Sequence, residues 1–123
     1  MKKIVPFNVF GNETDYLTLS IKDIMTIETI TRKSIIDIWN DLVNSKYTLT
    51  DLISCLIVAY NDCLVKREEK PLTTESFAQK LEFALENGAS IQSFSYPLAQ
   101  AILDVGLFGK KQTAARQEQT EQQ

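Results

Sequence analysis

The spacing of apolar residues changes near residue 20, and this change limits the chain to a mainly helical fold. Before it, apolar and polar residues alternate over 5–9 and 17–21, as they do in half-buried strands. The polar stretch 11–15 between them contains glycine and asparagine, which tolerate the positive φ of a tight turn. From Ser20 onward the apolar residues recur every three or four positions. The sequence therefore predicts a mainly α fold, in which a short N-terminal β-hairpin precedes four to five helices.

Residues with side-chain hydroxyls stand where the first three helical periods begin, as N-cap residues do. Ser20 precedes a helix predicted to end at about Ile30, and Ser34 precedes the second helix. Thr48 precedes the third helix, whose apolar stripe widens almost round its circumference; such a helix is usually central, because neighbours pack on several of its faces. The residues predicted to share a face are Ile21, Ile24, Met25 and Glu28 in the first helix, Ile35, Ile38, Trp39, Leu42 and Val43 in the second, and Leu49, Leu52, Ile53, Leu56, Tyr60, Cys63 and Leu64 in the third.

The last two helices have weaker boundaries. Thr73 or Thr74 caps the fourth, and Gly88 supplies its C-terminal stop. Residues 90–94 are predicted to form a short connector or a helical turn. The fifth helix is predicted to begin at Pro97, since proline suits a first helical turn, and to close at Gly106. The predicted apolar faces consist of Phe77, Leu81, Ala84 and Leu85 in the fourth helix, and Leu98, Ala101, Ile102 and Val105 in the fifth.

The chain of 123 residues has the size of one domain, with an ordinary globular composition of 44% hydrophobic and 24% charged residues. We assign residues 1–108 to a helical domain that includes the hairpin. Residues 109–123 contain no apolar residue larger than alanine, so we expect a disordered polar tail there. Cys55 and Cys63 lie about 12 Å apart along one predicted helix, which is too far for a disulfide. Reduced, buried thiols of a cytoplasmic protein are expected instead.

The composition argues against several classes of function. A net charge of -3 argues against a general nucleic-acid binder, which needs a basic face. The longest apolar run, 55–60, is far shorter than the roughly 20 residues of a membrane span. The chain has no histidine, zinc-ligand spacing or glycine-rich phosphate loop, so we expect no enzyme activity, no cofactor and no metal site. Asp37 and Asp41, one helical turn apart, are interpreted as a solvated polar face rather than a cation site.

Partner binding is the class of function that remains. Trp39 and Tyr60 are candidate partner anchors, because aromatic side chains dominate interface energetics, although their positions in apolar stripes favour the core. Leu107 and Phe108, just after the last helix, are further candidates. We expect the central helix around 55–60 to leave an uncovered apolar patch in so small a domain. The charged stretch 66–71 is interpreted as a solvated loop.

Four segments follow one another in a recognisable order. They are YLTLSIKDIMTIET, in which a strand with Leu17 and Leu19 leads into a helix with Ile24 and Glu28; YTLTDLISCLIVAYND, a capped central helix; LTTESFAQKLEFALENGAS, a helix stopped by glycine; and LAQAILDVGLFGKK, a last helix before a polar extension. Together they resemble the tail assembly chaperones of long-tailed phages, including the related gene transfer agent tail protein, over most of residues 15–110. Trp39 and the charged stretch 66–70 depart from the family's pattern.

The resemblance implies a protein made in the host cytoplasm that binds the long tape measure protein and keeps its hydrophobic helices from aggregating. It also implies recruitment of tail tube subunits around that complex, and absence from the finished virion. Such a chaperone needs an adhesive surface and no catalytic residue; self-association into a homo-oligomer stays open.

Two other classes of protein stay open. A structural tail completion or adaptor subunit would share the same sequence features but would be found in the virion. A small helix-turn-helix regulator would concentrate lysine and arginine on one helix. Here the cluster of basic residues, Lys66, Arg67 and Lys70, is diluted by Glu68 and Glu69.

Overall fold

The computed structural model describes residues 3–108, in which five helices follow a two-stranded hairpin. The elements are β1 (Val5–Pro6), β2 (Tyr16–Leu17), α1 (Ile21–Thr31), α2 (Ile35–Val43), α3 (Leu49–Lys66), α4 (Thr74–Glu86) and α5 (Gln92–Asp104). The predicted mainly α fold with an N-terminal hairpin is confirmed. The predicted tail, residues 109–123, lies outside the described residues.

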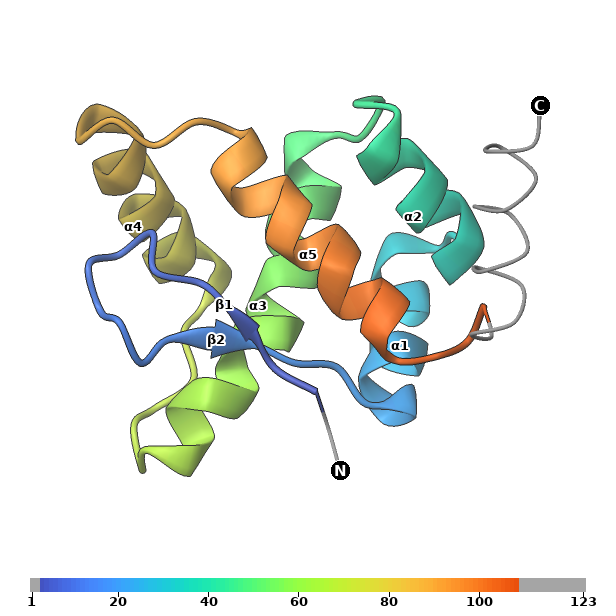
Figure 1. Ribbon diagram of the computed structural model, residues 1–123, viewed down its shortest axis with the longest axis horizontal. Coiled ribbons are helices and arrows are strands. Elements are labelled where there is room, and N and C mark those ends of the chain that lie inside the picture. The colour runs from blue at the N-terminus through green and yellow to red at the C-terminus, as the bar shows by residue number, and fades with distance from the viewer. Residues whose placement is uncertain (1–2, 109–123) are drawn as a thin grey trace, which may run out of the picture.

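Helix α3 is the centre of the arrangement, as its wide apolar stripe predicted. It packs against α1, α4, α5 and strand β2, and α5 crosses it on the face shown in Figure 1. Helices α1 and α2 lie at one end of the molecule and α4 at the other (Figure 1). Helix α4 packs chiefly against α3, so it has fewer neighbours than the other long helices.

The hairpin is short, and its second half does not alternate as predicted. The strands are antiparallel, with Val5 opposite Leu17. Leu17, Thr18 and Leu19 are all buried. Thr18 is satisfied there because its hydroxyl donates to the Lys3 carbonyl (2.8 Å) and its amide to the Ala59 carbonyl in α3 (3.2 Å). These bonds let a polar side chain occupy the interior between strand and helix.

The predicted N-caps of the first four helices are confirmed. Ser20 forms a complete capping box with Asp23, while Ser34 and Thr48 each accept the amide of the residue three positions on. Thr73, rather than Thr74, caps α4. These bonds satisfy amides that have no partner within their own helix.

The predicted start of the fifth helix is wrong. Helix α5 begins at Gln92, and Pro97 lies inside it. The residue at the cap position, Ile91, makes no side-chain capping bond, so the usual sequence signal for a start is missing. Pro97 has no amide hydrogen and leaves the Ser93 carbonyl without its usual intrahelical donor. Phe94, from the predicted connector, is one of the largest fully buried side chains.

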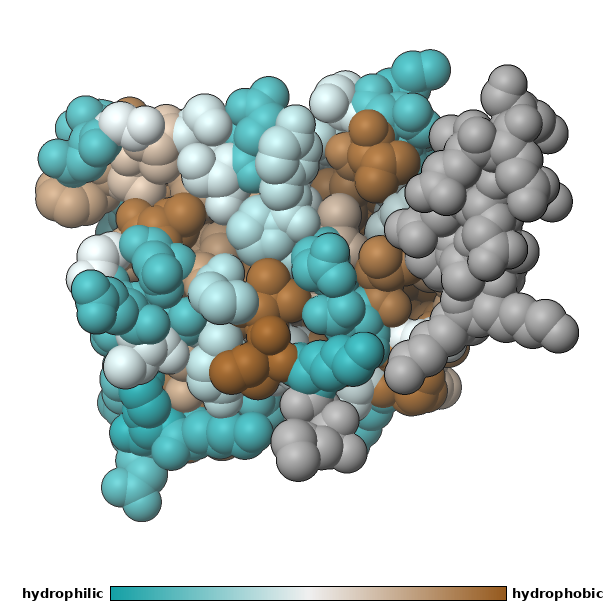
Figure 2. Space-filling model, in the orientation of Figure 1, coloured by the Kyte–Doolittle hydropathy of each residue, from teal (hydrophilic) through white to brown (hydrophobic). Residues whose placement is uncertain are grey.

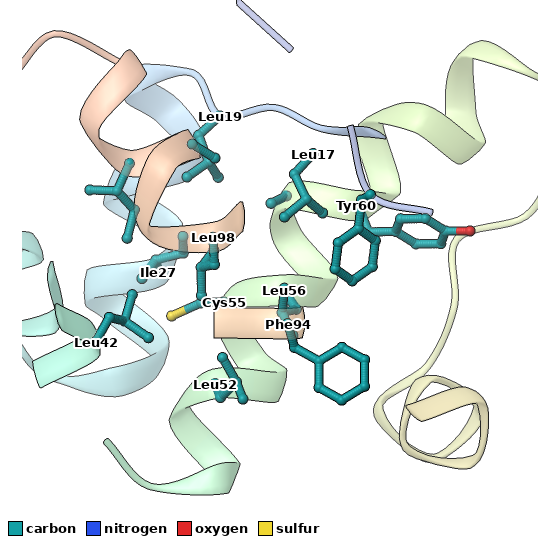
Figure 3. Close-up of a cluster of buried hydrophobic side chains, with 14 of the residues drawn as sticks. Leu17, Leu19, Ile27, Leu42, Leu52, Cys55, Leu56, Tyr60, Phe94 and Leu98 are labelled. Atoms are coloured by element: carbon teal, nitrogen blue, oxygen red, sulfur yellow. The ribbon is translucent and has the colours of Figure 1, made fainter. Parts of the chain in front are cut away.

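The buried side chains form one hydrophobic cluster around α3, part of which is drawn in Figure 3. The face predicted for α1 was wrong in part: Ile24 and Ile27 are buried, whereas Ile21 and Met25 are exposed. Both cysteines are buried free thiols, as predicted. The end of the core near the hairpin is aromatic, with rings in edge or tilted contact; its members are Phe7, Phe10, Tyr60, Phe77 and Phe94.

Candidate protein-binding surface

The outer face of α2 is the exposed apolar surface that contains most of the predicted anchors. Ile35, Ile38 and Leu42 point into the core. The next positions round the helix, Ile36 and Val43, are 55% and 48% exposed. We call the surface formed by Ile36, Trp39, Val43, Leu107 and Phe108 the α2 face.

Trp39 lies between Ile36 and Val43 in sequence and is half-buried. Its ring contacts that of Phe108, with 5.3 Å between ring centroids and 51° between ring planes. Leu107 beside it is exposed. The structure thus brings together three of the four predicted partner-binding residues, from two segments far apart in the sequence. Figure 2 shows apolar areas over α2 and α5, separated by polar side chains.

Two capping groups hold α2 in place beneath this surface. Ser34 accepts the Asp37 amide at 3.1 Å. The carboxylate of Glu28, in α1, accepts the Ile35 amide at 2.8 Å. A negative charge at a helix N-terminus is favourable because the first amides are unpaired and the helix dipole is positive there. Glu28, whose capping role has no signal in the sequence, therefore couples α1 to α2.

Tyr60, the fourth predicted residue, belongs to the core. It is 2% exposed, and its hydroxyl donates to Oδ2 of Asp15 at 2.8 Å. Its ring contacts those of Phe7, Phe10 and Phe77. The position of Tyr60 in the apolar stripe of α3 favoured a place in the core, and this prediction is confirmed. No free surface of the ring is available to a partner.

A buried carboxylate, Asp15, joins the hairpin loop to α3. It is 3% exposed, and both of its oxygens have partners: Oδ2 accepts from Tyr60, and Oδ1 lies 2.8 Å from Nη1 of Arg67. The Cys63 thiol lies 4.0 Å from Oδ1, and Arg67 also donates to the Thr14 hydroxyl (3.1 Å). An unpaired charge in this position would be costly, so the network holds the loop against the helix.

The sequence did not reveal this network. From the sequence alone, Asp15 belongs to a predicted polar turn and Arg67 belongs to a predicted solvated loop. Turn residues and mixed charge runs are usually solvated, and the partners Asp15 and Tyr60 are separated by 45 residues. Only the placement of Tyr60 in the core stripe gave a signal, since a buried tyrosine hydroxyl needs a hydrogen-bond partner.

Burial changes the acidity of two side chains on α3. The pKa of the Cys55 thiol rises from 9.0 to about 12, mainly because burial disfavours the thiolate, with a further contribution from the charge of Asp51. The pKa of Tyr60 is raised by burial first, and then by its hydrogen bond to Asp15 and the negative charge there. Both side chains therefore stay protonated at neutral pH.

The expected patch around 55–60 is absent, because neighbours cover this part of α3. Cys55, Leu56, Ala59 and Tyr60 are buried, and the two residues between them, Ile57 and Val58, are half-buried. Among the described residues, the large exposed apolar side chains lie on the other helices and at the ends of α3, apart from Ile4 and Leu107, which lie outside the helices.

Within residues 3–108, no group of three or more histidine, cysteine, aspartate or glutamate side chains is placed to hold a metal ion. Asp41, one of the two carboxylates considered for a cation, lies 3.5 Å from the Lys33 ammonium. No helix in the part of the chain that the structure describes is long and apolar enough to cross a bilayer.

Comparisons of the chain with protein-family models, curated proteins and solved structures gave no match.

Proposed function

We propose that this protein is a tail assembly chaperone of a tailed phage, which binds the tape measure protein and recruits tail tube subunits during tail assembly. The observation that carries the proposal is the α2 face, an apolar stripe with a tryptophan near its centre. Exposed apolar side chains that lie together on one helix face are typical of protein-binding surfaces, and tryptophan is enriched among the residues that dominate binding. The resemblance of the segment order to these chaperones supplies the identity of the partners.

The proposed mechanism is capture through the α2 face. An amphipathic helix of the tape measure protein packs its apolar stripe against Ile36, Trp39 and Val43, as helices do in groove binding. Capture covers apolar surface that would otherwise lead the free tape measure to aggregate. The protein acts in the host cytoplasm and is absent from the finished particle.

Co-expression with the tape measure protein tests this proposal. We expect the tape measure to be soluble and to co-purify with the chain. Phe108→Asp and Leu107→Asp should weaken co-purification, because each places a charge in the α2 face. Val65→Asp is the matched control, since Val65 is 59% exposed and lies in the last turn of α3, away from α2 in Figure 1. An insoluble tape measure beside abundant, folded protein would reject the proposal.

A structural tail subunit is the nearest alternative, because the same α2 face could form a permanent contact between subunits. Mass spectrometry of purified virions separates the two, since only the structural subunit would be present in them. A helix-turn-helix regulator is less well supported by the helices themselves. None of α1 to α5 carries more than one lysine or arginine, whereas a recognition helix needs several to contact phosphates.

A further inference from the structure

A second apolar surface lies between α3 and α4, and α4, which forms one of its walls, lies at the opposite end of the molecule from α2 (Figure 1). It is a groove with a cavity volume of about 280 Å³. Its walls are formed mainly by the first turns of α3 and by one side of α4. The residues used below are Leu49 and Ile53 from α3, Leu81, Glu82 and Leu85 from α4, and Phe94 from α5.

The groove exists because α4 packs chiefly against α3, and nothing among the described residues covers the outer edge of that contact. Leu49 and Leu85 were predicted to lie on the apolar faces of their helices from the spacing of apolar residues, yet they are 56% and 45% exposed. The lining residues of α4 lie on one face of the helix, because they are three or four positions apart. They are Ala78, Leu81, Glu82 and Leu85, and this face extends over about two turns, roughly 10 Å along the helix axis. A helix is the element whose apolar stripe matches this length and spacing.

The charge at the groove is acidic. Glu82 is the single charged residue in its lining, and Glu86 follows one helical turn later on the same side of α4. Lysine and arginine are absent from the lining. A ligand with lysine or arginine beside an apolar stripe is therefore complementary to the groove, and an anionic amphiphile such as a fatty acid is not.

The chain itself does not supply such a ligand. A second copy would have to offer a helix with several basic residues, and none of α1 to α5 has more than one. The segment 109–123 contains lysine and arginine but no apolar residue larger than alanine, so it lacks side chains that could fill the groove. These two observations favour a different protein as the occupant.

We propose that the α3–α4 groove binds a basic amphipathic helix of another protein, with apolar side chains at i, i+3 or i+4, and i+7, and lysine or arginine facing Glu82 and Glu86. This inference goes beyond the proposed function, because it concerns a different surface and holds whatever the partner's role. It gives the protein two separate binding surfaces, so that two chains can be held at once.

The test measures binding of a labelled peptide of about 16 residues, roughly four helical turns, by fluorescence anisotropy with the full-length protein. The probe has leucine at the stated spacing and lysine on both flanks. One control peptide has glutamate in place of lysine, and another has the same composition with the leucine spacing scrambled. We expect the lysine peptide to bind and both controls to bind at least about tenfold more weakly.

Variants of the protein locate the site. Leu85→Glu should weaken binding of the lysine peptide about tenfold or more, because it places a charge in the apolar wall. Glu82→Lys should weaken it by about two- to fivefold and improve binding of the glutamate peptide, as expected for one exposed ion pair. Val65→Glu, in the last turn of α3 and outside the groove lining, is the matched control and should leave binding unchanged, since Val65 is 59% exposed.

The folding of each variant can be followed independently, because the single tryptophan, Trp39, lies on α2 and not in the groove. Failure of the lysine peptide to bind, equal affinity for the lysine and glutamate peptides, or unchanged binding by folded Leu85→Glu would each overturn the proposal. None of these results depends on the tape measure protein, so the groove and the proposed function fail separately.

Discussion

Nη1 of Arg67 lies 2.8 Å from Oδ1 of Asp15, so that a residue just after α3 neutralises a carboxylate buried beneath the hairpin loop. The other oxygen of Asp15 accepts the Tyr60 hydroxyl. The loop is thus fastened by two side chains, Tyr60 in α3 and Arg67 just after it, which lie seven positions or about two helical turns apart. Each of the three side chains can be removed separately.

Removing the carboxylate should destabilise the protein strongly. Asp15→Ala leaves the partly buried Arg67 without its buried carboxylate partner and the buried Tyr60 hydroxyl without its acceptor, so we expect a loss of about 3 kcal/mol in the free energy of unfolding. Urea denaturation followed by circular dichroism measures this loss. Glu69→Ala is the control: Glu69 is an exposed partner of the same Arg67, and its removal should cost about 0.5 kcal/mol or less. Equal losses in both variants would contradict the assigned role of Asp15.

Tyr60→Phe tests the second contact. It keeps the ring in the aromatic core and removes only the hydroxyl, so we expect a loss of about 1–2 kcal/mol. In the Asp15→Ala background the same substitution should cost much less, because the hydrogen bond is already gone. A double-mutant cycle by urea denaturation gives the coupling energy, and strictly additive losses would argue against the bond.

The cap that Glu28 provides across the α1–α2 turn should be measurable. Glu28→Ala removes an acceptor for the Ile35 amide, with an expected loss of about 1 kcal/mol, and hydrogen exchange at this amide should become faster. Glu28→Gln keeps an acceptor oxygen but removes the charge, so its free energy of unfolding should fall by less than that of Glu28→Ala. If the two variants exchange at the wild-type rate, the carboxylate does not cap α2 in solution.

Stability should fall at alkaline pH. The folded protein holds the Cys55 proton up to about pH 12, whereas the unfolded chain releases it near 9.0, so the unfolded state binds fewer protons between these values. The free energy of unfolding therefore decreases as pH rises through this window, by at most about 1.4 kcal/mol per pH unit for each such group. Tyr60, whose pKa is also raised, adds to the decrease above pH 10.

The contribution of the Cys55 thiol is obtained by comparing how steeply the free energy of unfolding depends on pH in the wild type and in Cys55→Ala. Cys55→Ala changes the packing of the core, but its stability should depend less steeply on pH between about 9 and 10, before tyrosine titrates in the unfolded chain. Urea denaturation at a series of pH values measures both slopes. A variant with the wild-type slope would show that Cys55 is not protected.

The ring contact on the α2 face offers an optical signal. Phe108→Ala removes the aromatic neighbour of Trp39, so the tryptophan becomes more exposed and its emission should shift to longer wavelength. Binding of a partner at the α2 face should shift the emission of the wild-type protein to shorter wavelength. Leu107→Ala serves as the control, because it removes an exposed side chain that is not in ring contact with Trp39. Identical spectra for Phe108→Ala and the wild type would contradict the contact.

Local chemistry made the helices predictable. Ser20, Ser34 and Thr48 mark three helix starts with a side-chain acceptor, and the structure has the bonds that these residues predict. The start of α5 has no such residue. Pro97 gave a misleading signal for the start, because proline is common in a first helical turn but can also lie inside a helix. The sequence therefore located elements where a short-range bond defines their ends.

The surfaces were predictable only in part. Trp39 and Phe108 are neighbours in space, but their separation in sequence carries no signal of a contact. Leu49 and Leu85 follow the apolar period as well as their buried neighbours do, and their exposure depends on how few helices surround α4. Periodicity shows which face of a helix is apolar; whether another element covers that face is a property of the whole arrangement.

The fastening of the hairpin loop also sets an order of events during synthesis. The first strands are made early, but the two donors that hold their loop, the Tyr60 hydroxyl and the Arg67 guanidinium, are made later. At a synthesis rate of about 5–20 residues per second, the 45 residues between Asp15 and Tyr60 take roughly 2–9 s to make. During that interval the nascent N-terminus has no native partner in α3, and its aromatic side chains Phe7 and Phe10 are available to other chains on the same polysome.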